Sequence, residues 1–250
     1  MSVPITESGQ IMSFRYGDDA IVFERVTRSQ AIGKVLIKVY PSCRVVVSAP
    51  KDASNDDVLR AVKKRGRWIY EQLREFKKLL EFTTPRKYIS GESHYYIGKQ
   101  YLLKVITASD QTQSVKLLRG KLEVTVRGPS TEKVKKLLDD WYKARAKEVF
   151  SKRLDAMLAH TLWVAERPPL RVLTMQTQWG SCSRNGRLTL NPHLVKAHRD
   201  CIDYVILHEL CHIAEFNHSE RFYRLMNKVM PQWEKIKHRL DEMVNLIFID

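Results

Sequence analysis

The chain has 250 residues, of which 44% are hydrophobic, so it can bury a substantial core and is not intrinsically disordered. Lysine and arginine number 43 against 28 aspartate and glutamate residues, and the resulting net charge of +15 favours anionic partners. No apolar run is long enough to span a membrane, and the N-terminal segment lacks the pattern of a secretion signal. Four scattered cysteines without C-x-x-C spacing are typical of a reducing compartment, so we expect a cytoplasmic protein without membrane contact.

The first fifty residues predict β-strands joined by tight turns. Gly17-Asp18-Asp19 separates two strand-like runs and is typical of a hairpin turn, and Pro41-Ser42 separates two more runs. The expected strands comprise residues 11–16, 20–26, 34–40 and 44–47.

A helix is expected next, with Ser54 as its N-cap and apolar residues at helical spacing along one side. Two further hairpins are expected at residues 95–105 and 117–126, with a polar loop at 109–114 between them. We therefore interpret residues 1–129 as an N-terminal β-rich part.

Residues 130–250 show a different pattern. A long helix is expected to begin at a cap formed by Ser130 or Thr131, because apolar residues then recur at helical spacing as far as Leu158. Two more helices are expected at the C-terminus. The remaining expected elements are short strands at 170–175 and 188–190 and a helix at about 200–214. The sequence thus predicts an α+β fold, with a mostly antiparallel sheet in its first part.

The helix expected at about 200–214 carries the motif His208-Glu209-Leu210-Cys211-His212. Histidines four residues apart lie on one face of a helix, so both imidazoles can bind one Zn²⁺ ion. Glu209 lies between them and can act as a general base on water bound to that ion. The apolar flanks of the motif argue against a chance arrangement, because burying imidazoles and a carboxylate without partners is costly. Cys211 points in another direction and is expected to be a packing residue.

A catalytic zinc site needs a third protein ligand and one open position. His218 follows His212 by six residues, or about 600° of helical rotation, so it can approach the ion only if the helix ends first. Asn217 is a suitable left-handed residue for that turn, and Ser219 can cap a new helix. We favour His218 as the third ligand. The alternatives are Glu215, Glu220, Glu234 and His238.

Three blocks of the sequence carry a resemblance to a known family. The first joins the histidine motif to Asn217-His218-Ser219 and Phe222. The second comprises Gln178-Trp179-Gly180-Ser181-Cys182-Ser183, Gly186 and Leu188-Thr189-Leu190-Asn191. The third comprises Arg44-Val45-Val46-Val47-Ser48-Ala49-Pro50 and Arg67-Trp68-Ile69. Together they resemble the YgjP-like metallopeptidase family, which is related to SprT-like and WLM zinc proteases. The resemblance spans roughly residues 15 to 245.

The resemblance implies a zincin-like, minigluzincin-type α+β metallopeptidase domain in residues 130–250. It also implies that His208, His212 and His218 are the zinc ligands and that Glu209 is the catalytic glutamate. One departure concerns the residue before Trp179, which is usually basic in the family and is Gln178 in this chain. If that basic residue meets an anionic group, the substrate preference differs here.

These features predict a zinc-dependent hydrolase, most directly a metallopeptidase in which Glu209 activates water for attack on a peptide carbonyl. Its partner would be a peptide or protein substrate. Residues 179–183 are expected near an edge strand to which an extended peptide can add. No oxyanion-stabilising residue is singled out, although Arg184, Arg221 and Tyr223 lie near the motifs.

Two alternative functions remain open. The same apparatus could hydrolyse phosphoanhydrides, as a nucleoside triphosphate pyrophosphatase, and the positive charge favours such substrates. Alternatively, a structural zinc with Glu234 or His238 as fourth ligand would indicate a nucleic-acid-associated adaptor. Basic clusters at residues 60–67 and 133–147 are the candidate nucleic-acid or nucleotide contacts, although solvated helix faces explain them as well.

Overall fold

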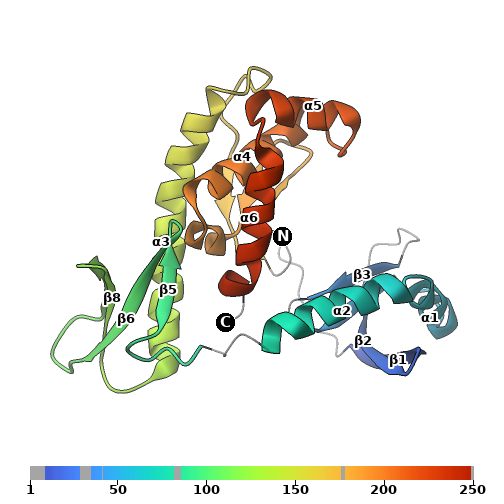
Figure 1. Ribbon diagram of the computed structural model, residues 1–250, viewed down its shortest axis with the longest axis horizontal. Coiled ribbons are helices and arrows are strands. Elements are labelled where there is room, and N and C mark those ends of the chain that lie inside the picture. The colour runs from blue at the N-terminus through green and yellow to red at the C-terminus, as the bar shows by residue number, and fades with distance from the viewer. Residues whose placement is uncertain (1–8, 29–34, 41, 82–85, 176–177, 249–250) are drawn as a thin grey trace. The chain divides into compact units, whose positions relative to one another are not determined.

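The computed structural model describes residues 9–28, 35–40, 42–81, 86–175 and 178–248 (Figure 1). The chain forms two compact units that divide between Thr84 and Pro85. Each unit has its own hydrophobic core.

The first unit is a four-stranded sheet followed by two helices. The strand order is β1-β2-β4-β3, with antiparallel outer pairs and a parallel pair, β2 and β4, in the centre. Gly17 has a φ of 62° in the turn between β1 and β2, which confirms the expected hairpin. The elements are β1 (Gln10–Tyr16), β2 (Asp19–Arg28), β3 (Leu36–Val39), β4 (Val45–Pro50), α1 (Asn55–Lys64) and α2 (Gly66–Glu81).

The helices of the first unit pack on the sheet through a small apolar core. Ser54 caps α1 as expected, because its hydroxyl accepts a hydrogen bond of 3.1 Å from the Asp57 backbone N–H. Val58 and Val62 of α1 and Ile69 of α2 are fully buried. They belong to the same core as Phe14, Ile21, Phe23, Val45, Val47 and Ala49 of the sheet.

The second unit begins with a sheet of the same topology. Its strand order is β5-β6-β8-β7, again with antiparallel outer pairs around a parallel central pair. The strands are β5 (Ser93–Tyr96), β6 (Lys99–Thr107), β7 (Ser114–Leu118) and β8 (Lys121–Val126). The same four-stranded topology therefore occurs twice in the chain, although the sequence shows no internal repeat.

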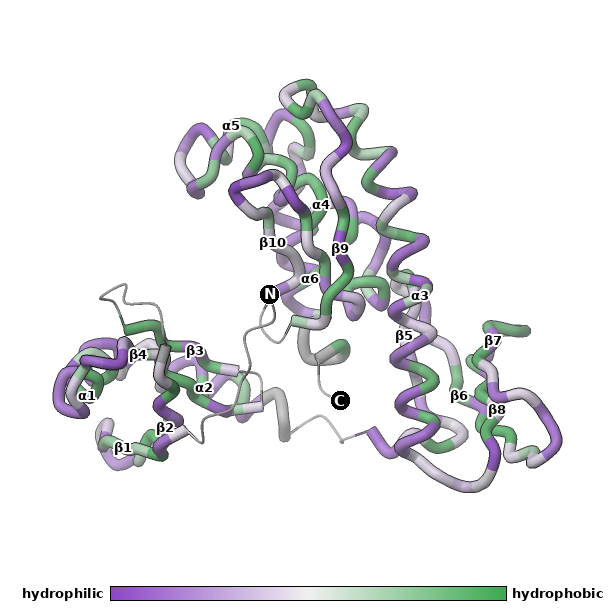
Figure 2. The backbone as a smooth tube through the Cα atoms, turned by 180° about the vertical axis from the view of Figure 1, so that it is seen from behind, coloured by the Kyte–Doolittle hydropathy of each residue, from purple (hydrophilic) through white to green (hydrophobic). Residues whose placement is uncertain are grey.

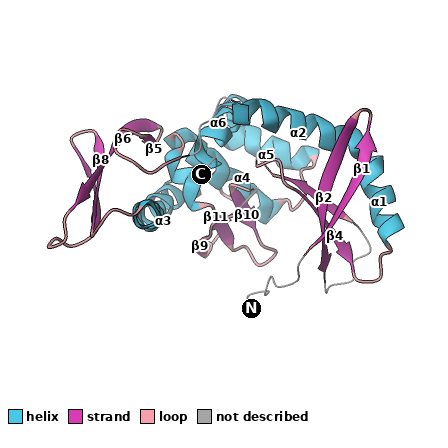
Figure 3. Ribbon diagram, turned by 90° about the horizontal axis from the view of Figure 1, so that it is seen from below, coloured by secondary structure: helices cyan, strands magenta, loops and turns pink. Residues whose placement is uncertain are grey.

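Helices and a third, small sheet complete the second unit. The small sheet has the order β10-β11-β9, so β10 lies at an edge (Figure 3). The elements are α3 (Thr131–Leu158), β9 (Leu170–Val172), β10 (Gly180–Cys182), β11 (Leu188–Leu190), the 3₁₀ helix η1 (Pro192–Lys196), α4 (Arg199–Ala214), α5 (Glu220–Val229) and α6 (Trp233–Phe248).

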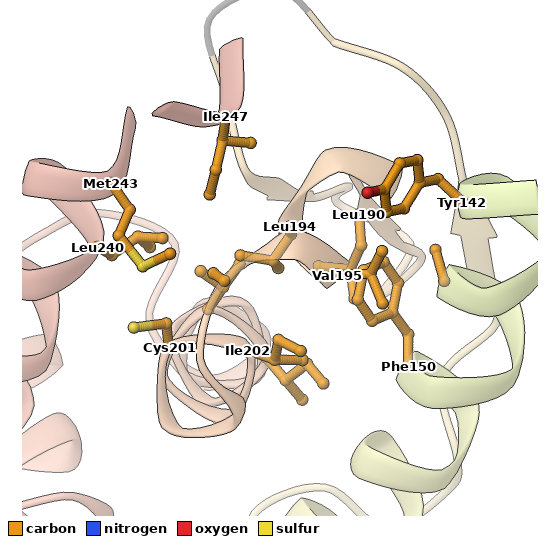
Figure 4. Packing of buried hydrophobic residues seen from close by; sticks show 14 of the residues in the cluster. Tyr142, Phe150, Leu190, Leu194, Val195, Cys201, Ile202, Leu240, Met243 and Ile247 are labelled. Atoms are coloured by element: carbon orange, nitrogen blue, oxygen red, sulfur yellow. The ribbon is translucent and has the colours of Figure 1, made fainter. Parts of the chain in front are cut away.

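Helix α4 lies at the centre of this core, in contact with α3, α5, α6 and β10. Most of its side chains are buried, whereas α3 alternates between polar and apolar residues along its length (Figure 2). Figure 4 shows the start of α4 and η1 packed between α3 and α6, with Leu194 and Ile202 between Phe150 and Leu240. The α+β class predicted from the sequence is confirmed.

The boundary between the units differs from the one expected at residues 129 and 130. The second sheet packs with α3 and η1 of the same unit. The Tyr142 hydroxyl donates a hydrogen bond of 2.8 Å to the Tyr95 carbonyl, and the Ile97 N–H donates one of 2.8 Å to the Val195 carbonyl. Such long-range bonds place residues 85–129 in the same unit as α4.

None of the described helices is both long enough and apolar enough to cross a lipid bilayer.

An ion pair joins α3 to α4 and should contribute to the stability of the second unit. Arg153 donates through Nε and Nη2 to the two carboxylate oxygens of Asp203, at 2.6 and 2.8 Å, and both side chains are largely buried. Arg153→Met leaves Asp203 without its partner, so we expect the free energy of unfolding to fall by about 2 kcal/mol in urea titrations. Lys136→Met removes an exposed pair with Asp140 on the same helix and should cost less than about 0.5 kcal/mol. Equal losses in the two variants would contradict this interpretation.

Candidate metal centre

The site begins with the spacing of two histidines on α4. His208 and His212 lie one turn apart, and their ring centroids are 5.0 Å apart. Helix α4 ends at Ala214, and Ser219 caps α5 by accepting a hydrogen bond of 3.4 Å from the Phe222 N–H. The turn between the two helices returns His218 to the histidines, and its Nε2 lies 3.0 Å from Nε2 of His208.

The end of α4 differs in one respect from the sequence expectation. The prediction that Asn217 adopts a left-handed conformation was wrong, because Asn217 is not among the described residues with positive φ. The helix instead ends on Glu215, which is extended, with φ −140° and ψ 103°. Its N–H still donates to the Cys211 carbonyl at 2.9 Å, so the last turn of the helix is closed without a left-handed residue.

Three ring nitrogens converge at this point. One nitrogen each from His208, His212 and His218 lies within 4.8 Å of the other two, and no fourth potential ligand joins this cluster among the described residues. The alternative ligands lie elsewhere: Glu234 and His238 are exposed on α6, where His238 lies 3.7 Å from Glu242, and Glu220 lies 3.7 Å from Arg224. Glu215 is the residue that ends α4.

The chemical state of the imidazoles suits a divalent metal ion. Burial first, and then the positive charge that His212, His218 and Lys237 can carry, lowers the pKa of His208 to about 3. Burial also lowers the pKa of His218. His212 Nδ1 lies 3.1 Å from the Glu215 carbonyl, and a proton held there leaves Nε2 as the free lone pair. Three ring nitrogens within 4.8 Å of one another have the donor type and the proximity that a metal ion requires.

Phe222 supports all three imidazoles. Its ring is fully buried, and its centroid lies 4.9 Å from that of His208, 4.6 Å from His212 and 4.7 Å from His218. In the sequence Phe222 belongs to the block that joins the histidine motif to His218, but the block gave Phe222 no role. The fold shows that its ring contacts all three imidazoles.

Glu209 lies on the side of α4 that faces strand β10. Its side chain is 5% exposed, and burial raises its pKa to about 8. The Cys182 backbone N–H hydrogen-bonds its carboxylate and offsets part of that rise. Gly180 makes this approach feasible, since a Cβ atom there would lie 2.8 Å from Glu209 Oε1 and 2.9 Å from Val205 Cγ1.

The other residues near the motifs have separate surroundings. The Tyr223 ring stacks on Trp233 with centroids 5.6 Å apart and lies 6.3 Å from the His218 ring. Arg221 is exposed on α5, and the Arg184 guanidinium lies over Phe216. Cys211 is buried, with its sulfur 3.5 Å from that of Met226, which fits the packing role expected for it.

The basic clusters lie on helices in both units. Lys63, Lys64, Arg65 and Arg67 are exposed around the junction of α1 and α2. On α3, Lys136 and Arg145 form ion pairs within the helix, with Asp140 and Glu148, and Lys135 donates to the Tyr88 hydroxyl at 3.1 Å. Intramolecular partners therefore take up part of the charge on α3, and contact with nucleic acid or nucleotides stays a prediction.

Three histidines that converge beside a buried glutamate are typical of metal-dependent hydrolases. Residues 34–243 match the YgjP-like, metallopeptidase domain, and the chain therefore belongs to this family, as its sequence blocks predicted. Two metallopeptidase zymogens of known structure, each 21% identical, align with part of it at a TM-score of 0.32. Pyrococcus abyssi abylysin covers 41% of this chain and 94% of its own, and Methanocaldococcus jannaschii jannalysin covers 39% and 94%. No curated protein matches the chain.

The close approach of β10 to Glu209 generates a prediction. Gly180→Ala forces a methyl group against Glu209 and Val205, so we expect the variant to lose about 1–3 kcal/mol of unfolding free energy. Thermal unfolding followed by circular dichroism measures the loss. Ser181→Ala, in the same strand, is the matched control and should unfold close to the wild-type temperature. A Gly180→Ala protein as stable as the control would show that β10 does not lie against Glu209.

Proposed function

We propose that the chain is a zinc-dependent peptidase that hydrolyses peptide bonds in peptides or proteins. The convergence of His208, His212 and His218 beside the buried carboxylate of Glu209 carries this proposal. Membership of a metallopeptidase family supports it. The four cysteines form no disulfide, which supports a cytoplasmic site of action.

The three imidazoles would hold the zinc ion through one ring nitrogen each. Bound Zn²⁺ acidifies water and, as a Lewis acid, polarises a substrate carbonyl. Three protein ligands leave a coordination position open to the reaction, whereas a structural zinc is closed by four. Because the cluster has three members among the described residues, the site supports a catalytic role over that of an adaptor.

Glu209 would be the proton carrier. Its neighbours on α4 are the two motif histidines, and its carboxylate is fixed by the Cys182 N–H rather than free to rotate in solvent. Such a carboxylate can take a proton from the attacking water and deliver it to the nitrogen of the leaving amine. Glu209 is buried and the backbone of Gly180 lies close to its side chain, which limits the access of bulk water to the carboxylate.

The outer edge of β10 supports a peptide as substrate. The Asn191 N–H donates to the Trp179 carbonyl and the Ser183 N–H to the Arg187 carbonyl, so the alternation of the ladder turns Ser181 toward β11. Gly180 and Cys182 then present backbone groups on the other edge, where Cys182 meets Glu209. An extended peptide that added to this edge would run past the proposed general base.

The test compares zinc content with turnover in three variants. We expect His218→Ala to lose zinc, because two imidazoles bind it far more weakly than three, and Glu209→Gln to retain zinc while peptide cleavage falls at least about 100-fold. His238→Ala, an exposed histidine on α6, is the control and should match the wild type in both. Elemental analysis and mass spectrometry of a peptide library measure the two quantities.

Two outcomes would contradict the proposal. Peptide cleavage by Glu209→Gln at the wild-type rate would show that Glu209 is not the general base. Release of phosphate or pyrophosphate from nucleoside triphosphates, with every peptide left intact, would replace the peptidase by a nucleotide hydrolase.

The shared contact of Phe222 gives a further prediction. Phe222→Leu keeps an apolar side chain but removes the ring on which the three imidazoles rest, so their orientation loosens. We expect zinc affinity to fall about tenfold, measured by competition with a chromogenic chelator. Met226→Leu, also buried on α5, serves as the control. Unchanged affinity in Phe222→Leu would show that the rings are oriented by other contacts.

A further inference from the structure

A hollow of about 450 Å³ lies beside the metal centre, between the end of α4 and the turn that joins β10 to β11. His212 forms one wall, and Ile213 and Ala214 continue it along the helix. The turn lines the hollow with Ser183, Arg184 and Gly186. Phe216, which follows α4, also lines it. The hollow therefore begins where β10 ends and shares a residue with the proposed zinc site.

The charge in this hollow is positive. Among the described residues that line it, Arg184 alone carries a permanent charge and none is acidic. Its guanidinium lies over the Phe216 ring, 5.7 Å from the centroid, and no ion pair or hydrogen bond of this guanidinium is found within the described parts of the chain. Phe216 is 53% exposed, so solvent and a ligand can reach this part of the hollow.

A guanidinium held on an aromatic face keeps its edge free for hydrogen bonding. The contact with the ring restricts the exposed Arg184 side chain, so less conformational freedom is lost when its N–H groups bind an anion. A carboxylate matches this edge in a bidentate geometry. The hydroxyl of Ser183, which accepts a hydrogen bond of 3.1 Å from the Arg187 N–H, still has its own proton to donate in the same turn.

We propose that this hollow is a substrate subsite that binds a carboxylate next to the scissile bond, with Arg184 as the residue that determines the preference. The inference rests on the proposed peptidase function. The carboxylate has two sources with the same chemistry, an acidic side chain or the C-terminus of the peptide. The net positive charge of the chain acts in the same direction by attracting acidic substrates.

The experiment measures binding without turnover, on the full-length, zinc-loaded Glu209→Gln protein. The probes are fluorescent octapeptides, acetylated and amidated, in which one Glu or its neutral isostere Gln is moved through each position. A second set has neutral side chains and either a free or an amidated C-terminus. Fluorescence anisotropy gives the dissociation constants.

We expect at least one Glu peptide, or the free-acid peptide, to bind about tenfold more tightly than its neutral counterpart. Arg184→Gln should abolish this difference, and Arg184→Lys should restore part of it. Arg187→Gln, an exposed arginine of the same turn that does not line the hollow, should leave the difference intact. The set in which discrimination appears identifies the source of the carboxylate.

Three results would overturn the inference: no discrimination at any position, discrimination that survives Arg184→Gln, or binding of a nucleoside triphosphate in preference to every peptide. Failure of the peptidase function itself appears separately, as wild-type protein that leaves all the peptides uncut. If acidic peptides bind preferentially but the wild-type protein does not cut them, the proposed subsite is supported and the proposed peptidase function is contradicted.

Discussion

The burial of α4 is the constraint on which the rest of the second unit depends. A helix that packs against α3, α5, α6 and β10 has little surface left for water, yet this helix carries two imidazoles and a carboxylate. Polar groups in such a position are stable only with partners. Two partners come from outside the helix, His218 from the turn after α4 and the Cys182 N–H from β10, and the third is the carbonyl of Glu215, on which α4 ends.

Burial also sets the electrical properties of the site. It keeps His208 neutral, which metal binding requires, and it makes the charged form of Glu209 costly. A divalent cation held by the imidazoles would offset that second cost, because an opposite charge nearby favours the carboxylate. The same burial that makes the charged carboxylate costly would therefore favour a cation bound beside it.

Close packing contacts fix the positions of the imidazoles and of Glu209. Phe222 touches three imidazoles at once, and Gly180 lets a strand lie directly on the glutamate. Arg153 and Asp203 join α4 to α3, and the Trp163 indole N–H donates to the Leu210 carbonyl at 2.9 Å within the motif itself. Helix α4 is thus held on several sides, so its histidines are positioned by rigid elements rather than by loops.

The sequence by itself determined what depends on local spacing. The α+β class, the hairpins, the caps at Ser54 and Ser219 and the histidines on one helix face all follow from period, turn chemistry and motif, and the family followed from its blocks. Tertiary structure decided everything that depends on which distant elements meet. It brought His218 rather than Glu234 or His238 to the pair on α4, and placed the second sheet with α3. It also set Gly180 against Glu209, and Arg184 over Phe216. Contacts between residues far apart in the chain are fixed by packing and loop closure, and neither leaves a periodic trace in a single sequence.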